Sequence, residues 1–238
     1  MPDSRYSVAR MRRTQQGRQQ ISNSAHSMDD GATEHVAVNV KDVARRHIES
    51  GRKVVPIPTG EKGPRTTNWQ NLTIATVDVD VHFTSSNQNI GLILGEPSGG
   101  LVDVDLDCEE AVRLAPAYLP TTGTITGRDG RPESHWWYIC DGAETTRHRD
   151  PAVAKNATTV ELRSTGAQTV VGPSIHPDGS RYELLEGDTS RVSVGVLSAC
   201  VKALHEAVLK ERGHEEQGKA SVSKPKADSI QSSPVGDG

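Results

Sequence analysis

The stretch that decides the fold is Leu101–Asp107, with the sequence LVDVDLD, in which apolar residues alternate with aspartates. Residues two apart in a β-strand point to the same face, so Asp103, Asp105 and Asp107 are expected to line one face. Adjacent carboxylates repel and raise each other's pKa unless a cation neutralises them. Two divalent metal ions about 3.5–4 Å apart would do so, and such pairs catalyse in-line phosphoryl transfer. A solvated edge strand with one polar face explains this stretch equally well.

The composition predicts one folded domain with disordered ends. The chain has 238 residues, which is enough for one sizeable domain plus tails. Hydrophobic residues make up only 34% of it, and the mean hydropathy is -0.55, so part of the chain should not join a core. The net charge of -4 gives no overall basic surface. Contacts with nucleic acid must therefore come from local Arg and Lys side chains.

Three regions are expected along the chain. Residues 1–35 are rich in Arg, Gln and Ser and are predicted to be a disordered basic tail. An organellar transit peptide has a similar composition, and Met28 is an alternative start. Residues 36–210 are predicted to form the folded domain that carries the candidate site. Residues 211–238, rich in Lys, Ser, Gln and Gly, are predicted to be a disordered tail or a linker.

The three cysteines are Cys108, Cys140 and Cys200, and none forms a C-x-x-C pair. Their odd number and spacing argue against a disulfide framework and against a cysteine zinc site, so no zinc is predicted. They favour a reducing compartment, and we expect a cytoplasmic protein. No apolar run approaches the roughly 18 residues that a membrane span needs, so no membrane contact is expected.

Hydrophobic periodicity predicts an α+β fold. Helices are expected at residues 40–48, 76–83, 109–118 and 192–209. Strands are expected at residues 54–57, 89–95, 101–107, 124–126, 134–138, 160–163 and 168–171. The expected architecture is a mainly antiparallel sheet that carries the acidic residues, with helices packed on its other face.

A second informative region is the predicted turn with Arg128 and Arg131, which leads into Ser134 and His135. A lone histidine in a strand is more often structural than catalytic. Two arginines just before it favour an anion-binding site, because guanidinium groups match the geometry of phosphate oxygens.

A third region contributes Glu161 and Arg163, which alternate with Val160 and Leu162 in a predicted strand. Glu161 would supply a third carboxylate to a metal pair. The alternative is an exposed acid that pairs with Arg163 or Arg181, an interaction that contributes little to stability.

These regions follow one another in a fixed order: an acid-x-acid strand, a serine and histidine, then an apolar-acid step beside an arginine. This order resembles the archaeo-eukaryotic primase superfamily. It is most similar to the bifunctional DNA primase/polymerase domain of plasmid, phage and bacterial replication proteins. The resemblance extends from about Val40 to Glu186, with supporting phrases at residues 51–56, 89–95 and 166–174. It implies a primase-polymerase catalytic fold for the predicted domain.

The resemblance assigns metal ligation to Asp105, Asp107 and Glu161, with Asp103 as an extra acid on the same face. The family often has Asp where this chain has Glu161. The resemblance also implies that His135 contacts the phosphates of the incoming nucleotide.

Four further residues are candidates for holding that nucleotide. The resemblance places Arg163 near the triphosphate, and Ser134 accompanies the histidine of the second motif. Arg128 and Arg131 are added on physical grounds, as cations close to the same phosphates. Lys62 and Arg65, in a loop rich in Gly and Pro, are weaker candidates for phosphate contact, because a solvated loop explains them better.

The implied activity is template-directed nucleotidyl transfer with two Mg²⁺ or Mn²⁺ ions, by a DNA primase/polymerase that makes and extends primers on single-stranded DNA. Its substrates would be nucleoside or deoxynucleoside triphosphates, and its setting the replication of bacterial, phage or plasmid DNA. No P-loop motif occurs in the chain, so a separate replicative helicase is an expected partner. Two alternatives stay open: a metal-dependent nuclease that uses the same acids, and a non-catalytic replication module that binds DNA.

Overall fold

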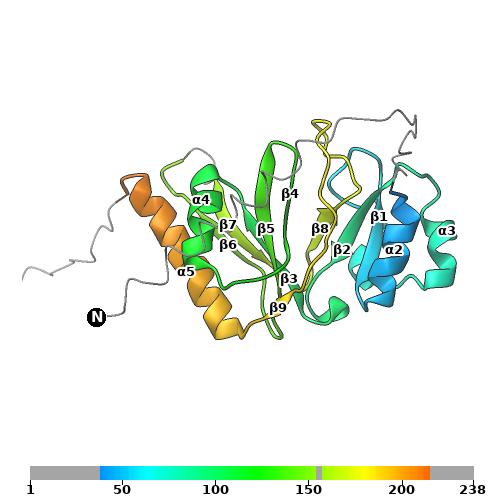
Figure 1. Cartoon of the computed structure of the whole chain (residues 1–238), viewed down its shortest axis with the longest axis horizontal. Coiled ribbons are helices and arrows are strands. Elements are labelled where there is room, and N and C mark those ends of the chain that lie inside the picture. Colours follow the sequence, from blue (N-terminus) through cyan, green and yellow to red (C-terminus); the bar gives the residue numbers. More distant parts are fainter. Residues whose placement is uncertain (1–37, 154–156, 215–238) are drawn as a thin grey trace, which may run out of the picture. The chain divides into compact units, whose positions relative to one another are not determined.

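The computed structural model describes residues 38–153 and 157–214 (Figure 1). The predicted tail at residues 1–35, and residues 215–238 of the predicted second tail, lie outside the described residues. The described part contains helices and mainly antiparallel strands, and the predicted α+β fold class is confirmed.

The acidic stretch forms the central strand of a six-stranded sheet. Five strands follow one another in the antiparallel order β4-β5-β3-β7-β6, and β9 pairs in parallel with β5. Their bounds are β3 (Leu101–Leu106), β4 (Ile125–Arg128), β5 (Arg131–Ile139), β6 (Thr146–Arg149), β7 (Thr158–Arg163) and β9 (Ser190–Arg191). All six residues of β3 are buried. The edge-strand alternative for this stretch is therefore wrong.

A second, three-stranded antiparallel sheet has the order β1-β2-β8. Its strands are β1 (Lys53–Ile57), β2 (Asn89–Ile93) and β8 (Gln168–Val171). Gly95 brings the chain from this sheet into β3 with a φ of +75°. A side chain at this position would collide with the backbone of Thr165, which explains why glycine is needed there.

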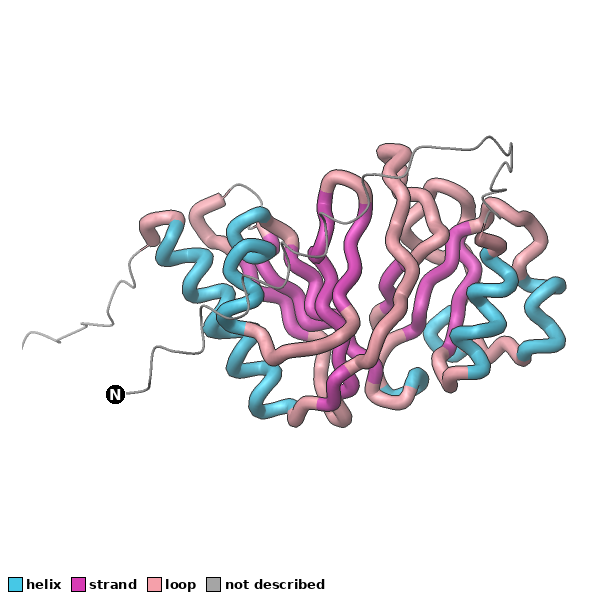
Figure 2. The backbone as a smooth tube through the Cα atoms, in the orientation of Figure 1, coloured by secondary structure: helices cyan, strands magenta, loops and turns pink. Residues whose placement is uncertain are grey.

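Helices cover the apolar side of the six-stranded sheet and the outer side of the smaller one. The helices are α2 (Val40–Glu49), α3 (Val79–His82), α4 (Glu109–Tyr118) and α5 (Val194–Glu211), with short 3-10 turns at η1 (Trp69–Asn71), η2 (Thr76–Asp78) and η3 (Glu96–Ser98). The strands of both sheets lie between α5 on one side and α2 on the other (Figure 2). None of the helices in the described residues combines the length and the apolar character that a membrane crossing requires.

The alternation in β3 explains this layering. Val102, Val104 and Leu106 are wholly buried in one core together with Leu197 and Leu204 of α5. Burial of such side chains stabilises the fold by roughly 1.5–3 kcal/mol each. The aspartates of the same strand consequently point to the opposite face of the sheet, away from α5.

Two strands were not predicted, and several boundaries differ from the sequence prediction, among them the start of β5 at Arg131 instead of Ser134. β6, with the sequence TRHR, and the two-residue β9 were not predicted, because neither shows an alternation of apolar and polar residues. The last helix ends at Glu211, and Arg212 beyond it forms ion pairs with Glu110 and Asp150 at 2.9 Å each. Residues 211–214 thus belong to the folded part.

Candidate active site

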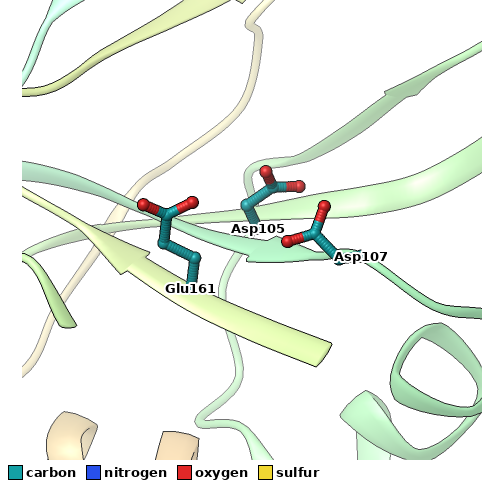
Figure 3. Close-up of side chains that lie close together, drawn as sticks. All are labelled: Asp105, Asp107 and Glu161. Atoms are coloured by element: carbon teal, nitrogen blue, oxygen red, sulfur yellow. The ribbon is translucent and has the colours of Figure 1, made fainter. Parts of the chain in front are cut away.

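Three carboxylates converge on the polar face of the six-stranded sheet. Asp105 lies on β3, directly opposite Glu161 of β7 in the antiparallel register, and Asp107 follows immediately after β3. One oxygen from each carboxylate lies within 4.8 Å of the other two. Figure 3 shows the three side chains turned to the same side of the sheet. Asp105 and Glu161 are buried, whereas Asp107 is exposed.

The acid cluster formed by Asp105, Asp107 and Glu161 fits a hard divalent cation. Its donors are all oxygen, which Mg²⁺ and Mn²⁺ prefer. Partial desolvation of its carboxyl group, and then the negative charge of Asp105, raise the pKa of Asp107 to about 6. The raised pKa reflects repulsion among neighbouring carboxylates, and a bound cation would reduce this repulsion. The residues present therefore suit a divalent metal ion.

Asp103 lies on the same strand face but not in the acid cluster. Its carboxylate is wholly buried and lies 3.0 and 3.2 Å from Nδ1 of His135. It also accepts a hydrogen bond of 2.7 Å from Oγ1 of Thr169. These contacts hold the side chain of His135 in place. Metal ligation by Asp103 stays a prediction.

His135 lies on β5, opposite Asp105 in the register. Its Nδ1 is 3.6 Å from the Asp105 carboxylate, in addition to its contact with Asp103. Burial lowers the pKa of His135, but the charges of Asp103 and Asp105 outweigh burial and raise it overall. With Nδ1 occupied by a carboxylate, Nε2 is the nitrogen left to contact a ligand.

Two arginines pair with the acid cluster. Nε of Arg163 lies 3.2 Å from Glu161, and its guanidinium also forms an ion pair with Asp105. Arg147 of β6 lies 2.5 Å from the other oxygen of Glu161. Burial lowers the pKa of Arg163, but the negative charges of these carboxylates outweigh burial, and the net result is a pKa above the ordinary value. Glu161 is therefore not the exposed acid of the alternative interpretation, because its side chain is buried, although the pairing with Arg163 that this interpretation expected is present.

The remaining predicted residues are held by local hydrogen bonds. Arg128 pairs with Asp178 at 2.9 Å and donates to Oγ of Ser180 at 2.7 Å. Arg131 donates to the carbonyl oxygen of Leu106 at 3.0 Å, which ties the β4–β5 turn to the end of β3. Ser134 donates to the carbonyl oxygen of Arg131 at 3.1 Å. A local structural role for Ser134 accounts for this contact.

A cavity of about 550 Å³ joins all the predicted site residues except Asp103. The structure adds further lining residues that the sequence did not identify as site residues: Trp69, Arg147, Gln168, Thr169, His176 and Tyr182. Arg147 was missed because β6 gives no periodic signal, and His176 and Tyr182 because they lie outside the predicted strands. Lys62 also lines the cavity, whereas Arg65 does not and instead pairs with Glu61.

Two comparisons with known proteins bear on the identity of the chain. A comparison with curated proteins found no match. The model of the family described as bifunctional DNA primase/polymerase, N-terminal, matches residues 44–198. This match covers more than half of the chain and includes the acid cluster, His135 and both of the arginines that pair with the acids. The chain belongs to the bifunctional DNA primase/polymerase N-terminal family.

Proposed function

We propose that this domain makes and extends primers on single-stranded DNA by template-directed nucleotidyl transfer, in the replication of bacterial, phage or plasmid DNA. Membership of the family supports a nucleotidyltransferase of the DNA primase/polymerase kind. The observation that carries the proposal is the acid cluster at a cavity whose other lining residues are mainly cationic or polar. That combination suits a metal-bound nucleoside triphosphate.

In this proposal Asp105, Asp107 and Glu161 would hold two Mg²⁺ or Mn²⁺ ions. Bound there, such ions would lower the pKa of a 3′-hydroxyl and neutralise charge that develops on the leaving pyrophosphate. The 3′-oxygen forms a bond to the α-phosphorus, and the bond from that phosphorus to the bridging oxygen breaks. Pyrophosphate leaves with the electron pair, and the hydroxyl proton passes to water.

The chain's own contribution is to bind and orient the triphosphate. His135, held by Asp103, would donate from Nε2 to a phosphate oxygen. Arg163 and Arg128 would neutralise the same group, and Lys62 lines the same cavity. Fixed donors aimed at a charged group need little reorganisation during the reaction, and such positioning supplies most of the rate in phosphoryl transfer.

Primer synthesis on primer-free single-stranded DNA tests the proposal. The wild type should incorporate labelled nucleotides when Mg²⁺ or Mn²⁺ is present, and parallel reactions with dNTPs and NTPs would identify the preferred sugar. The double variant Asp105→Ala, Asp107→Ala should make no product while still binding a fluorescent oligonucleotide. Asp141→Ala is the matched control, because Asp141 is exposed and does not line the cavity.

The outcomes separate the alternatives. Equal synthesis by the double variant and the wild type would show that the acid cluster is not the catalytic site. Metal-dependent cleavage of labelled DNA without synthesis would favour the nuclease. DNA binding with neither synthesis nor cleavage would favour the non-catalytic module.

A further inference from the structure

A small hollow of about 150 Å³ lies beside the last turn of α2, in the part of the fold built on the smaller sheet. Its polar lining comes from the end of α2 and the residues just after it, and from the loop before β9: Arg46, His47, Ser50, Arg52 and Glu186. None of these residues lines the cavity that carries the acid cluster. The hollow is therefore a separate candidate site.

The two arginines of this hollow have no acidic partner within residues 38–153 and 157–214. On the same helix, by contrast, Lys41 and Arg45 both pair with Asp80. Arg46 is exposed and Arg52 is half-buried. Burial lowers the pKa of Arg52, and no carboxylate in the described part of the chain offsets this effect. The arginines thus leave positive charge available for an anion.

His47 gives a second, independent indication of a ligand. Its side chain is buried, with a relative exposure of 5%. Nδ1 of the ring lies 3.3 Å from Nη1 of Arg52, and it must accept there, because a guanidinium group only donates. The proton of the neutral ring is therefore on Nε2, which is buried without a hydrogen-bond partner among the described residues. A buried donor of this kind calls for an acceptor atom.

The size and charge of the hollow indicate what supplies that acceptor. Its volume corresponds to about five water molecules, so it takes one phosphate-sized group but not a base and a sugar. Guanidinium groups match the geometry of phosphate oxygens, and a histidine N–H can donate to a further oxygen. Glu186, the acid in the lining, offsets only one of the two arginine charges.

We propose that this hollow binds a phosphate group through the guanidinium groups of Arg46 and Arg52 and through Nε2 of His47. The group belongs either to inorganic phosphate or to a nucleotide whose base and sugar stay outside the hollow. Such binding requires none of the residues assigned to nucleotidyl transfer.

Calorimetric titration of the full chain with inorganic phosphate, and separately with adenosine 5′-monophosphate, tests the site. Arg46→Gln and Arg52→Gln should each weaken binding by at least about tenfold, because each removes a charged hydrogen bond. Glu186→Gln should strengthen it by about threefold, because it removes the negative charge beside the anion. Arg45→Gln is the matched control, since Arg45 lies on the same helix outside the hollow, and its affinity should stay within about twofold of the wild type.

The histidine supplies a readout of its own. Burial, and then the charges of Arg52 and Arg46, lower the pKa of His47 to about 3. A bound anion counters both arginines, so phosphate should raise this pKa, as followed by NMR of the ring protons. His47→Phe keeps a flat ring but removes the Nε2 donor, and it should weaken phosphate binding by at least about tenfold. Thermal unfolding identifies a variant that fails to fold, and the exposed Arg46 then decides.

The two probes also identify the source of the phosphate group. Tighter binding of the nucleotide, lost in Arg46→Gln, identifies a nucleotide, whereas equal affinities identify free phosphate. Absence of saturable binding of either probe would overturn the proposal, and so would affinities that the Arg46 and His47 variants leave unchanged. Competition by an oligonucleotide without a terminal phosphate, dependent on Arg46, would make the hollow a contact for the DNA backbone instead.

Discussion

Asp103 offers the sharpest test of how the site is organised, because it touches the histidine and lies outside the acid cluster. Replacing it by Asn keeps the shape of the side chain but removes the charge that faces Nδ1 of His135 at 3.0 Å. A hydrogen bond to a charged group contributes roughly 1.5–3 kcal/mol. If that interaction orients the histidine toward a triphosphate, Asp103→Asn should lower kcat/KM for the incoming nucleotide by about 10- to 150-fold.

The assay is extension of a preformed primer, combined with a double-mutant cycle. Asp103 is argued to act through His135, so Asp103→Asn should cost little once His135→Ala has been made. Thr169→Val removes the 2.7 Å hydrogen bond to Asp103 together with the long 3.5 Å one that Oγ1 accepts from Arg163, and it should have a smaller effect than Asp103→Asn. Binding of single-stranded DNA should change little in the Asn variant, whereas the Tm should fall by several degrees because a buried charged hydrogen bond is lost. Additive effects of the two substitutions would refute the view that Asp103 works by holding His135.

Three further predictions concern stability and metal binding. Burial, and then the charge of Arg52, lower the pKa of His47 to about 3, so below pH 6.5 the unfolded chain binds a proton at this residue that the folded chain does not bind. Between pH 7 and 4.5 the unfolding free energy of the wild type should therefore fall by about 2–3 kcal/mol more than that of His47→Gln, as measured by urea titration. Arg212→Ala should lower stability by about 1–3 kcal/mol in thermal unfolding, because Arg212 pairs with a buried acid, whereas Lys202→Ala, at an exposed pair, should cost under about 0.5 kcal/mol. Glu161→Gln should weaken Mn²⁺ binding by at least about tenfold. The electron paramagnetic resonance signal of free Mn²⁺ measures this binding.

Local patterns predicted the elements that carry the chemistry. The alternation in Leu101–Leu106 identified β3, and the helix predicted at residues 109–118 has the same bounds in the structure. These elements are readable because apolar burial imposes its own period on the sequence. β6 is different: its four residues include no apolar residue, and none is buried, so its contribution to the site, Arg147, carries no local signal.

The sequence also left the grouping of the aspartates open. Alternation alone puts Asp103 and Asp105 on the same face with equal claims to a metal. The structure separates them through their neighbours: Asp103 is opposite Arg163 and contacts His135 and Thr169, whereas Asp105 is opposite Glu161. These partners come from strands distant in the chain. Their pairing follows from the long-range register, which no single stretch of sequence encodes.

That register also explains how a fold can hold acids that repel one another. β3 is paired on both sides, so Asp105 faces His135 on β5 and Glu161 on β7 at the same level of the sheet. A slip of one residue would turn Val104 and Leu106 out of the core and the aspartates into it. Their burial against α5 therefore opposes any slip that would relieve the repulsion between the acids. The packing on one face of β3 fixes the geometry of the candidate metal site on the other.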